Sequence, residues 1–259
     1  MTRSTLTKRI EFSASHRYFK PEWDEERNRR VFGPCSQEHG HNYLLEVTLG
    51  GQVDPVTGMI INLYDLKHIV TDVLEEFDHK HLNFDMPYFE RLVPTPENLA
   101  LVLWRKFRER PETRDIASIR LCEGENLWAE LYPDPASPDK ADPAEALLTR
   151  RYALTVKRKA DASHVETWPL SLDVTVRGQI DPVTGRVTDI MALDKRVKER
   201  ILDHLQETNV SEHPEFAGRP VTLSTLAQVL WSRLTDVVDA RLERLRLTDH
   251  HDLTLDYSG

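Results

Sequence analysis

Three histidines near the start of the chain have the types and spacing of metal ligands. His39 and His41 occur in the string EHGHNY, just before an expected strand at Tyr43, and His16 ends the string IEFSASH. Residues two apart on an extended segment point to the same side, and Gly40 adds no side chain between them. Three neutral imidazoles with one open position form the ligand set of a catalytic zinc site, although nickel, copper and iron accept imidazole too. The alternative is polar strand ends that face water.

Cys35 and the pair Asp78-His79 are candidate proton-transfer groups. Cys35 lies four residues before His39, in GPCSQEHGH. A thiol beside a metal or a cationic imidazole has a lowered pKa and can act as a base or nucleophile. A carboxylate such as Asp78 can fix the tautomer of an adjacent imidazole. The structural alternatives are a small buried cysteine and a histidine that suits a helix C-terminus.

Glu123 is a candidate for recognising a planar ligand. It follows an apolar strand in SIRLCEGEN, and a carboxylate there can accept two parallel hydrogen bonds from a guanidine-like ring edge. A solvated loop glutamate is the alternative. The cluster Arg27, Arg29 and Arg30 could hold phosphates or lie on a solvated loop.

The elements that would position these residues are four strands of one sheet, one short additional strand and two helices. Alternation of apolar residues predicts strands at 8–15, 43–49, 59–63, 116–122 and 127–132, the third being a short strand that closes a hairpin after the turn at 54–58. Helical spacing predicts a helix over 66–77 and another that begins with Thr95 as N-cap and Pro96 as first residue. The fold class is therefore α+β, with a four-stranded antiparallel sheet and two helices on one face.

The chain repeats this pattern. GQVDPVTG at 51–58 returns as GQIDPVTG at 178–185, and further matches follow at the same offset of 127 over some sixty residues. A stretch rich in Pro, Ala and Asp separates the two copies. We expect a metal-binding domain at 1–132, a linker at 133–150 and a second domain of the same fold at 151–259.

Bulk properties exclude several classes. Hydrophobic residues make up 39% of the chain, enough for a packed core. The net charge of -9 argues against nucleic acid as the main partner. No apolar run approaches the roughly 18 residues that span a membrane, and no signal peptide is evident. The two cysteines form no disulfide framework, which favours a reduced, cytoplasmic protein.

Together these strings resemble the 6-pyruvoyltetrahydropterin synthase family, which includes the bacterial 6-carboxytetrahydropterin synthases of queuosine biosynthesis. The matching strings are FSASH, CxxxHGHNY, GQVDPVTGMIINLYDLK, FDHKHLN, PTPENLA and the strand ending in Glu123. The resemblance implies a T-fold in each copy, with sheets of neighbouring subunits closing into barrels. It implies a homo-oligomer, for which we favour a homotrimer over a dimer.

The resemblance also implies roles for individual residues. These are zinc on His16, His39 and His41; Cys35, Asp78 and His79 as catalytic groups; and Glu123 as pterin anchor, with Thr95 and Glu97 as further substrate-binding residues. The family substrate is 7,8-dihydroneopterin triphosphate. The spacing Cys-x-x-x-His-Gly-His is similar to that of the carboxy-forming enzymes. The alternatives are the pyruvoyl-forming reaction, which stops at triphosphate elimination, and a pterin-binding scaffold without activity.

The second copy is expected to lack the metal. His164 matches His16, but the segment that holds Cys35 and His39 has no counterpart. At the common offset the positions of His41, Asp78 and His79 are occupied by Trp168, Leu205 and Gln206. Near the end of each copy the offset becomes 126, and there Asp249 stands at the position of Glu123. One histidine cannot hold zinc, so we expect this copy to be a structural partner.

Overall fold

The computed structural model describes residues 4–134, 142–161, 164–235 and 239–259. The chain forms two compact units. Unit 1 is Met1–Leu148 together with Gln179–Val187, and unit 2 is Thr149–Gly178 together with Thr188–Gly259. Part of the expected linker, residues 135–141, lies outside the described residues.

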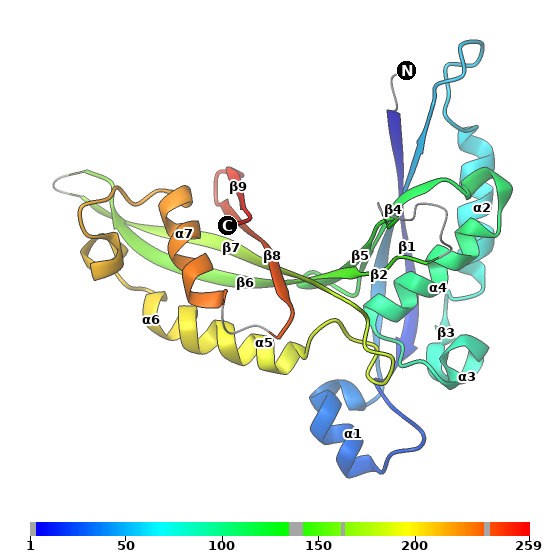
Figure 1. The fold of residues 1–259 in the computed structure, drawn as a ribbon, viewed down its shortest axis with the longest axis horizontal. Coiled ribbons are helices and arrows are strands. Elements are labelled where there is room, and N and C mark those ends of the chain that lie inside the picture. Colours follow the sequence, from blue (N-terminus) through cyan, green and yellow to red (C-terminus); the bar gives the residue numbers. More distant parts are fainter. Residues whose placement is uncertain (1–3, 135–141, 162–163, 236–238) are drawn as a thin grey trace. The chain divides into compact units, whose positions relative to one another are not determined.

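Unit 1 contains the predicted antiparallel sheet (Figure 1). Its strands follow the order β3-β1-β2-β4-β5, and all neighbours are antiparallel except β3 and β1, which are parallel. The bounds are β1 (Ser4–His16), β2 (His39–Gly51), β3 (Lys80–His81), β4 (Ile116–Cys122) and β5 (Leu127–Leu131). Alternate residues of β1 and β2 are buried, which is the pattern that predicted them. The α+β class is therefore confirmed.

Both predicted helices of unit 1 are present. Helix α2 (Leu63–Glu75) buries Leu66, Val70, Val73 and Leu74. Helix α4 (Pro96–Arg108) begins as predicted, because the Thr95 side chain accepts a hydrogen bond from the Asn98 N–H. Helix α4 packs on β4 and β5 and contacts α2, so both helices cover one face of the sheet (Figure 1).

The predicted short strand at 59–63 is wrong, because no strand forms there. The Asp54 carboxylate accepts hydrogen bonds from the N–H groups of Val56 and Thr57, which makes a tight local turn. Asn62 then caps α2 by accepting from the Tyr64 N–H. Since the helix starts at residue 63, too little chain remains for a strand.

Further short elements of unit 1 were not predicted. They are α1 (Glu25–Phe32), α3 (Leu82–Asp85) and 3-10 turns at Gly33–Ser36, Pro87–Glu90 and Pro111–Thr113. The sequence of helix α1 does contain signals of helix ends. Asp24 caps its N-terminus, acidic residues occupy its first turn, and Arg29 and Arg30 occupy its last turn. Arg27 stacks on the Trp23 ring at 4.1 Å.

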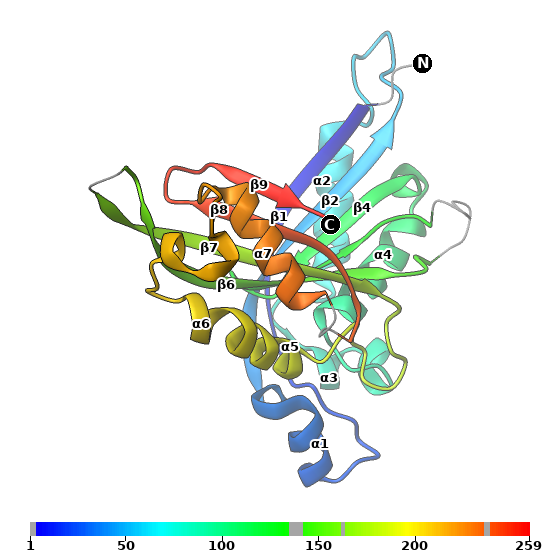
Figure 2. The same ribbon diagram turned by 60° about the vertical axis from the view of Figure 1, so that its left-hand side comes forward.

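Unit 2 repeats the arrangement with strands in the order β6-β7-β8-β9 (Figure 2). The strands are β6 (Ala146–Lys159), β7 (Val165–Gly178), β8 (Arg241–Asp249) and β9 (Thr254–Tyr257). The helices are α5 (Ile190–Val197), which continues through a π turn at Lys198–Leu202 into α6 (Asp203–Leu205), and α7 (Leu223–Leu234), with 3-10 turns at Val210–Glu212 and Pro214–Phe216. Helix α7 packs on β8 and β9.

Strand β6 begins inside the range that the sequence assigned to the linker. Ala146, Leu147 and Leu148 are buried, and burial of this apolar run favours a strand over a solvated connection. In the part of the chain that is described, no helix is both long and apolar enough to cross a membrane.

Candidate metal centre

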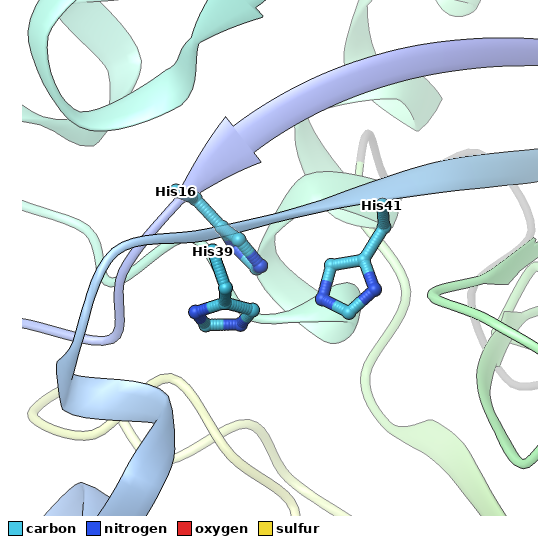
Figure 3. A group of neighbouring side chains, drawn as sticks. All are labelled: His16, His39 and His41. Carbon is cyan, nitrogen blue, oxygen red and sulfur yellow. The ribbon is translucent and has the colours of Figure 1, made fainter.

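The register of β1 and β2 brings the three histidines together. His16 pairs with His39, and Ala14 pairs with His41. Because side chains alternate along a strand, His16, His39 and His41 share one face of this ladder. One nitrogen from each ring lies within 4.8 Å of those of the other two, and the rings gather around one point (Figure 3). The histidine cluster expected from the sequence therefore exists, at a size that suits one metal ion.

Two of the rings are fixed in the tautomer that a metal requires. Nδ1 of His16 lies 2.8 Å from the carbonyl oxygen of Pro94, and Nδ1 of His39 lies 2.7 Å from that of Gln37. A carbonyl oxygen only accepts, so each Nδ1 must carry the proton and each Nε2 presents its lone pair. A backbone acceptor on the second nitrogen is the usual support of a metal-bound histidine.

The third ring and the electrostatics also suit a metal. Nε2 of His41 is buried and has no hydrogen-bond partner among the described residues. Burial, followed by the neighbouring charge of His39, lowers the pKa of His16 to about 3 and that of His41 to about 4. Both rings are therefore neutral near pH 7, which is the form that ligates. The donor set fits a divalent metal that accepts imidazole.

Glu123 places a buried carboxylate beside this cluster. It follows β4, and its N–H donates to the Leu127 carbonyl at 2.9 Å, which closes the turn to β5. One carboxylate oxygen lies 3.2 Å from Nε2 of His16, and the other accepts a hydrogen bond of 2.7 Å from the Tyr18 hydroxyl. Burial, then the charge of Glu123, raises the pKa of both Tyr18 and Tyr43. These hydroxyls therefore stay protonated and can hold the carboxylate in place.

Thr95 and Glu97 are fully buried at the start of α4. The Thr95 hydroxyl donates to the Gly185 carbonyl, and the Val187 N–H donates to Oε1 of Glu97 at 2.9 Å. Burial is the main reason that the pKa of Glu97 is raised. Both partners belong to the segment 179–187, which is part of unit 1. The structure thus gives these two residues neighbours that local sequence reasoning did not anticipate.

Cys35 lies in the 3-10 turn Gly33–Ser36, half-buried. It packs against the cluster of Tyr18, Phe32 and Val93. Its carbonyl oxygen accepts a hydrogen bond of 2.7 Å from the Tyr18 N–H. A backbone hydrogen bond therefore links Cys35 to Tyr18, which lies two residues beyond His16 and whose hydroxyl donates to Glu123.

Asp78 and His79 form a pair at the edge of β1. Oδ2 of Asp78 lies 3.0 Å from Nδ1 of His79, and Oδ1 of Asp78 accepts from the Ser13 N–H at 2.8 Å. The His79 N–H donates to the Ser13 carbonyl, and His79 has a positive φ of 58°. The His79 side chain is 81% exposed. The backbone of β1 thus holds the pair in an unusual conformation.

His79 lines an open pocket at the end of the β1–β2 ladder. The other lining residues come from both faces of that ladder and from the segment after His79, and they are Ser13, Ala14, Ser15, Gly40, His41, Asn42, Lys80, His81 and Asp85. Ser13 and Ser15 alternate with Ala14 and His16 along β1, so they face away from the cluster. Within the described residues, no hydrogen bond or ring contact joins His79 to His16, His39 or His41.

Comparison with known proteins identifies the family. The family model described as 6-pyruvoyl tetrahydropterin synthase matches residues 5–134 and again 149–259. The chain belongs to the 6-pyruvoyl tetrahydropterin synthase family. Both compact units thus carry residues matched by the same family model.

Three similar proteins each match less than half of this chain. It is 38% identical over 124 residues to the human 6-pyruvoyl tetrahydrobiopterin synthase, which covers 47% of this chain and 86% of the human protein. It is 35% identical over 97 residues to a candidate 6-carboxy-5,6,7,8-tetrahydropterin synthase of Archaeoglobus fulgidus, covering 38% of this chain and 77% of that protein. The solved 6-pyruvoyl tetrahydropterin synthase of Caenorhabditis elegans is 32% identical and aligns with 48% of this chain and 91% of its own, with a TM-score of 0.46.

The second family segment carries different side chains at the positions that correspond to His41, Asp78 and Glu123. Trp168 is buried beneath the guanidinium of Arg158, which lies 3.6 Å from the ring centroid. Leu205 is buried in the core, and Asp249 is partly exposed and accepts hydrogen bonds from the N–H groups of His251 and Leu253 in its own turn. His164 is exposed, and its neighbour Ser163 lies outside the described residues. Within the described ranges, the first-half histidines are the one group of metal-ligand type.

The sequence analysis missed two residues that contact this family site, Tyr18 and Arg186. Tyr18 is fully buried, and its hydroxyl donates to Glu123. The charge of Glu97 also contributes to raising the pKa of Tyr18, after burial and Glu123. Its position two residues after His16, on the same strand face by alternation, is the signal that could have identified it. Arg186 had no local signal, because it reaches unit 1 from the second repeat.

Proposed function

We propose that this family member is a zinc-dependent lyase that converts 7,8-dihydroneopterin triphosphate to 6-carboxytetrahydropterin, with its site in unit 1. The observation that carries the proposal is the position of Glu123, whose carboxylate lies 3.2 Å from Nε2 of His16. A buried acceptor for a pterin ring edge next to three clustered imidazoles suits a substrate with that ring and a dihydroxylated side chain.

The chain's own residues have distinct tasks in this proposal. Glu123 accepts two hydrogen bonds from the 2-amino group and the ring N–H of the pterin, and so sets its orientation. His16, His39 and His41 would hold zinc, which supplies Lewis-acid polarisation of the substrate hydroxyls. The Cys35 thiolate removes a proton from the substrate side chain. His79, held by Asp78, gives or takes a proton on the other side, and triphosphate leaves by elimination.

The location of Asp78 and His79 supports an assembled site. Since His79 makes no hydrogen bond or ring contact with the histidine cluster in the described part of one chain, we propose that a second copy supplies this pair. The chain would then act as a homo-oligomer, with a homotrimer favoured. The second family segment would serve as a structural partner, because the side chains at its equivalent positions are apolar or committed to turns.

The pyruvoyl-forming reaction is the second candidate. It is favoured by the identity of 38–40% to mammalian proteins named 6-pyruvoyl tetrahydrobiopterin synthase, compared with 35% for the relative of the carboxy-forming name. The spacing of Cys35 and His39 favours the carboxy-forming reaction. In that reaction a carbon–carbon bond breaks in retro-aldol fashion after elimination, and a two-carbon aldehyde leaves.

One incubation separates these candidates. The zinc-loaded protein is mixed with 7,8-dihydroneopterin triphosphate, and the products are identified by mass. A 6-carboxytetrahydropterin and a two-carbon aldehyde support the proposal, whereas a 6-pyruvoyl product with triphosphate alone supports the second candidate. Binding of the substrate without any product would indicate a scaffold, and would contradict both reactions.

A further inference from the structure

Residues 179–187 come from the second family segment but pack within unit 1. They lie directly against the start of α4. The Gly185 carbonyl accepts the Thr95 hydroxyl, and the Val187 N–H holds the Glu97 carboxylate. Gly185 has φ of 74°, and a Cβ there would lie 2.4 Å from the Asn98 amide nitrogen. The fit is therefore so close that glycine is required at this position.

Arg186 is the central side chain of this contact. It is 5% exposed. Its Nη1 donates to the Val31 carbonyl at 3.0 Å, and its guanidinium lies 4.8 Å from the centre of the Phe32 ring and 5.4 Å from that of Tyr18. Tyr18 in turn donates to Glu123. The Tyr18 side chain thus lies between Arg186 and Glu123. Arg186 also directly precedes Val187, whose N–H donates to the Glu97 carboxylate.

The same turn in the first repeat has none of these features. Met59 occupies the position of Arg186, and it is 45% exposed. Gly58 corresponds to Gly185 and has a similar φ of 70°, but a Cβ there would meet no atom within 4 Å. The arginine and the close packing therefore belong to the turn of the second repeat alone, although the two turns share the string DPVTG.

We propose that the second repeat contributes Arg186 to the first repeat's pterin site as a positioning residue, which holds the carboxylates of Glu123 and Glu97 for recognition of the pterin ring. The proposal rests on the function proposed above. Its geometric basis is that one short segment contacts both carboxylates, Glu97 directly through Val187 and Glu123 through Tyr18. The second repeat then has a task in the site as well as in the fold.

The physical reason is preorganisation. A carboxylate that is buried without a fixed partner is costly, and one that rotates between rotamers loses part of the two-point contact with a ring edge. The positive charge of Arg186 lowers the cost of burying Glu97, whose pKa burial raises. A cation against the Tyr18 ring also keeps the hydroxyl directed at Glu123.

The test uses neopterin, which has the ring and side-chain hydroxyls but no triphosphate to eliminate. Equilibrium binding of neopterin is measured for the zinc-loaded wild type, Arg186→Met and Arg186→Lys. Arg186→Met installs the residue of the first repeat, and we expect it to weaken binding on the order of tenfold. Arg186→Lys should restore part of the loss, and zinc content should equal that of the wild type in both variants.

Turnover adds a second measurement. With 7,8-dihydroneopterin triphosphate, Arg186→Met should raise KM more than it lowers kcat, because Arg186 acts on recognition of the ring. Neopterin affinity and KM equal to those of the wild type would overturn the proposal. If the wild type bound no neopterin and formed no product, the proposed function itself would fail, which is a separate outcome.

A pair of glycine variants distinguishes the contact from turn strain. Gly185→Ala and Gly58→Ala impose the same left-handed conformation on alanine, but only the first pushes a Cβ into Asn98. We expect Gly185→Ala to weaken neopterin binding and Gly58→Ala to leave it unchanged. Equal effects of the two would assign the loss to strain and would overturn the proposal, even if Arg186→Met failed to fold.

Discussion

A carboxylate oxygen of Glu123 lies 3.2 Å from Nε2 of His16, and these residues are separated by more than one hundred positions in the chain. His16 ends β1 and Glu123 follows β4, and β2 pairs with both strands. The sheet therefore places a group suited to a pterin ring beside a group suited to a metal. This juxtaposition sets the expectations that follow.

We expect the purified protein to contain about one zinc per chain, and His39→Ala or His41→Ala to lose it. Removal of one of three protein ligands leaves too few donors to hold the ion. Elemental analysis of fresh protein measures this. His164→Ala is the matched control, since His164 is exposed in the second repeat. Absence of metal from the wild type, or its loss from the control, would contradict the assignment.

Cys35→Ala should keep its zinc and lose most of its turnover. The thiolate acts as a base in the proposed reaction, and loss of such a group costs on the order of 10²–10⁴ in kcat. Steady-state kinetics with 7,8-dihydroneopterin triphosphate measures the effect. Cys122→Ala serves as control, because that thiol lies in β4 and is given no role. A Cys35→Ala enzyme with near-normal kcat would remove Cys35 from the reaction.

Glu123→Gln should weaken pterin binding roughly 10- to 100-fold while zinc content stays the same. An amide offers one acceptor where the carboxylate offers two, and the charge is lost. Titration with neopterin measures the affinity. Asp249→Asn changes the partly exposed counterpart in the second repeat and should have no effect. Equal affinities of wild type and Glu123→Gln would exclude the role of pterin anchor.

The chain should assemble, with a homotrimer favoured over a dimer. Barrels closed by three T-folds would give two stacked barrels from three chains, and a second copy could then present His79 to the cluster. Light scattering measures the mass, and a monomer at micromolar concentration would contradict this expectation. Mixed oligomers of Cys35→Ala and His79→Ala should regain activity, because some sites would then receive both intact groups.

The metal-free protein should lose stability as the pH falls from 6.5 towards 4. Burial lowers the pKa of His16 to about 3 and that of His41 to about 4, from the ordinary 6.5. In this window the unfolded chain binds protons at these rings and the folded chain does not, so acid favours unfolding, and the stability is fully present above pH 6.5. Urea midpoints of chelated protein at pH 7 and pH 5 measure the loss.

The variant His41→Asn provides the comparison for this pH dependence. Asparagine does not titrate, so the chelated variant should lose less stability than the chelated wild type between pH 7 and pH 5. The same loss in both proteins would show that His41 is not the source of the dependence.

The sequence by itself determined most local elements and the three histidines that gather in one cluster. The alternation around His16 and His41 gave the strand faces, and Thr95 followed by Pro96 marked the start of α4. These features could be predicted because strand alternation and helix capping depend on residues a few positions apart. The prediction of a short strand at 59–63 is wrong because side-chain hydrogen bonds stabilise other structure around it. Asp54 stabilises the turn before this segment and Asn62 the start of α2, and together they outweigh a weak apolar pattern.

Only the tertiary structure decided which distant groups share a site. Thr95 meets Gly185 across 90 positions, and Arg186 meets Val31 across 155. The place of His79 also depends on the tertiary structure, because its backbone N–H donates to the Ser13 carbonyl in β1. No local spacing encodes such contacts, because they result from the packing of whole elements, in which the burial of each side chain depends on all its neighbours.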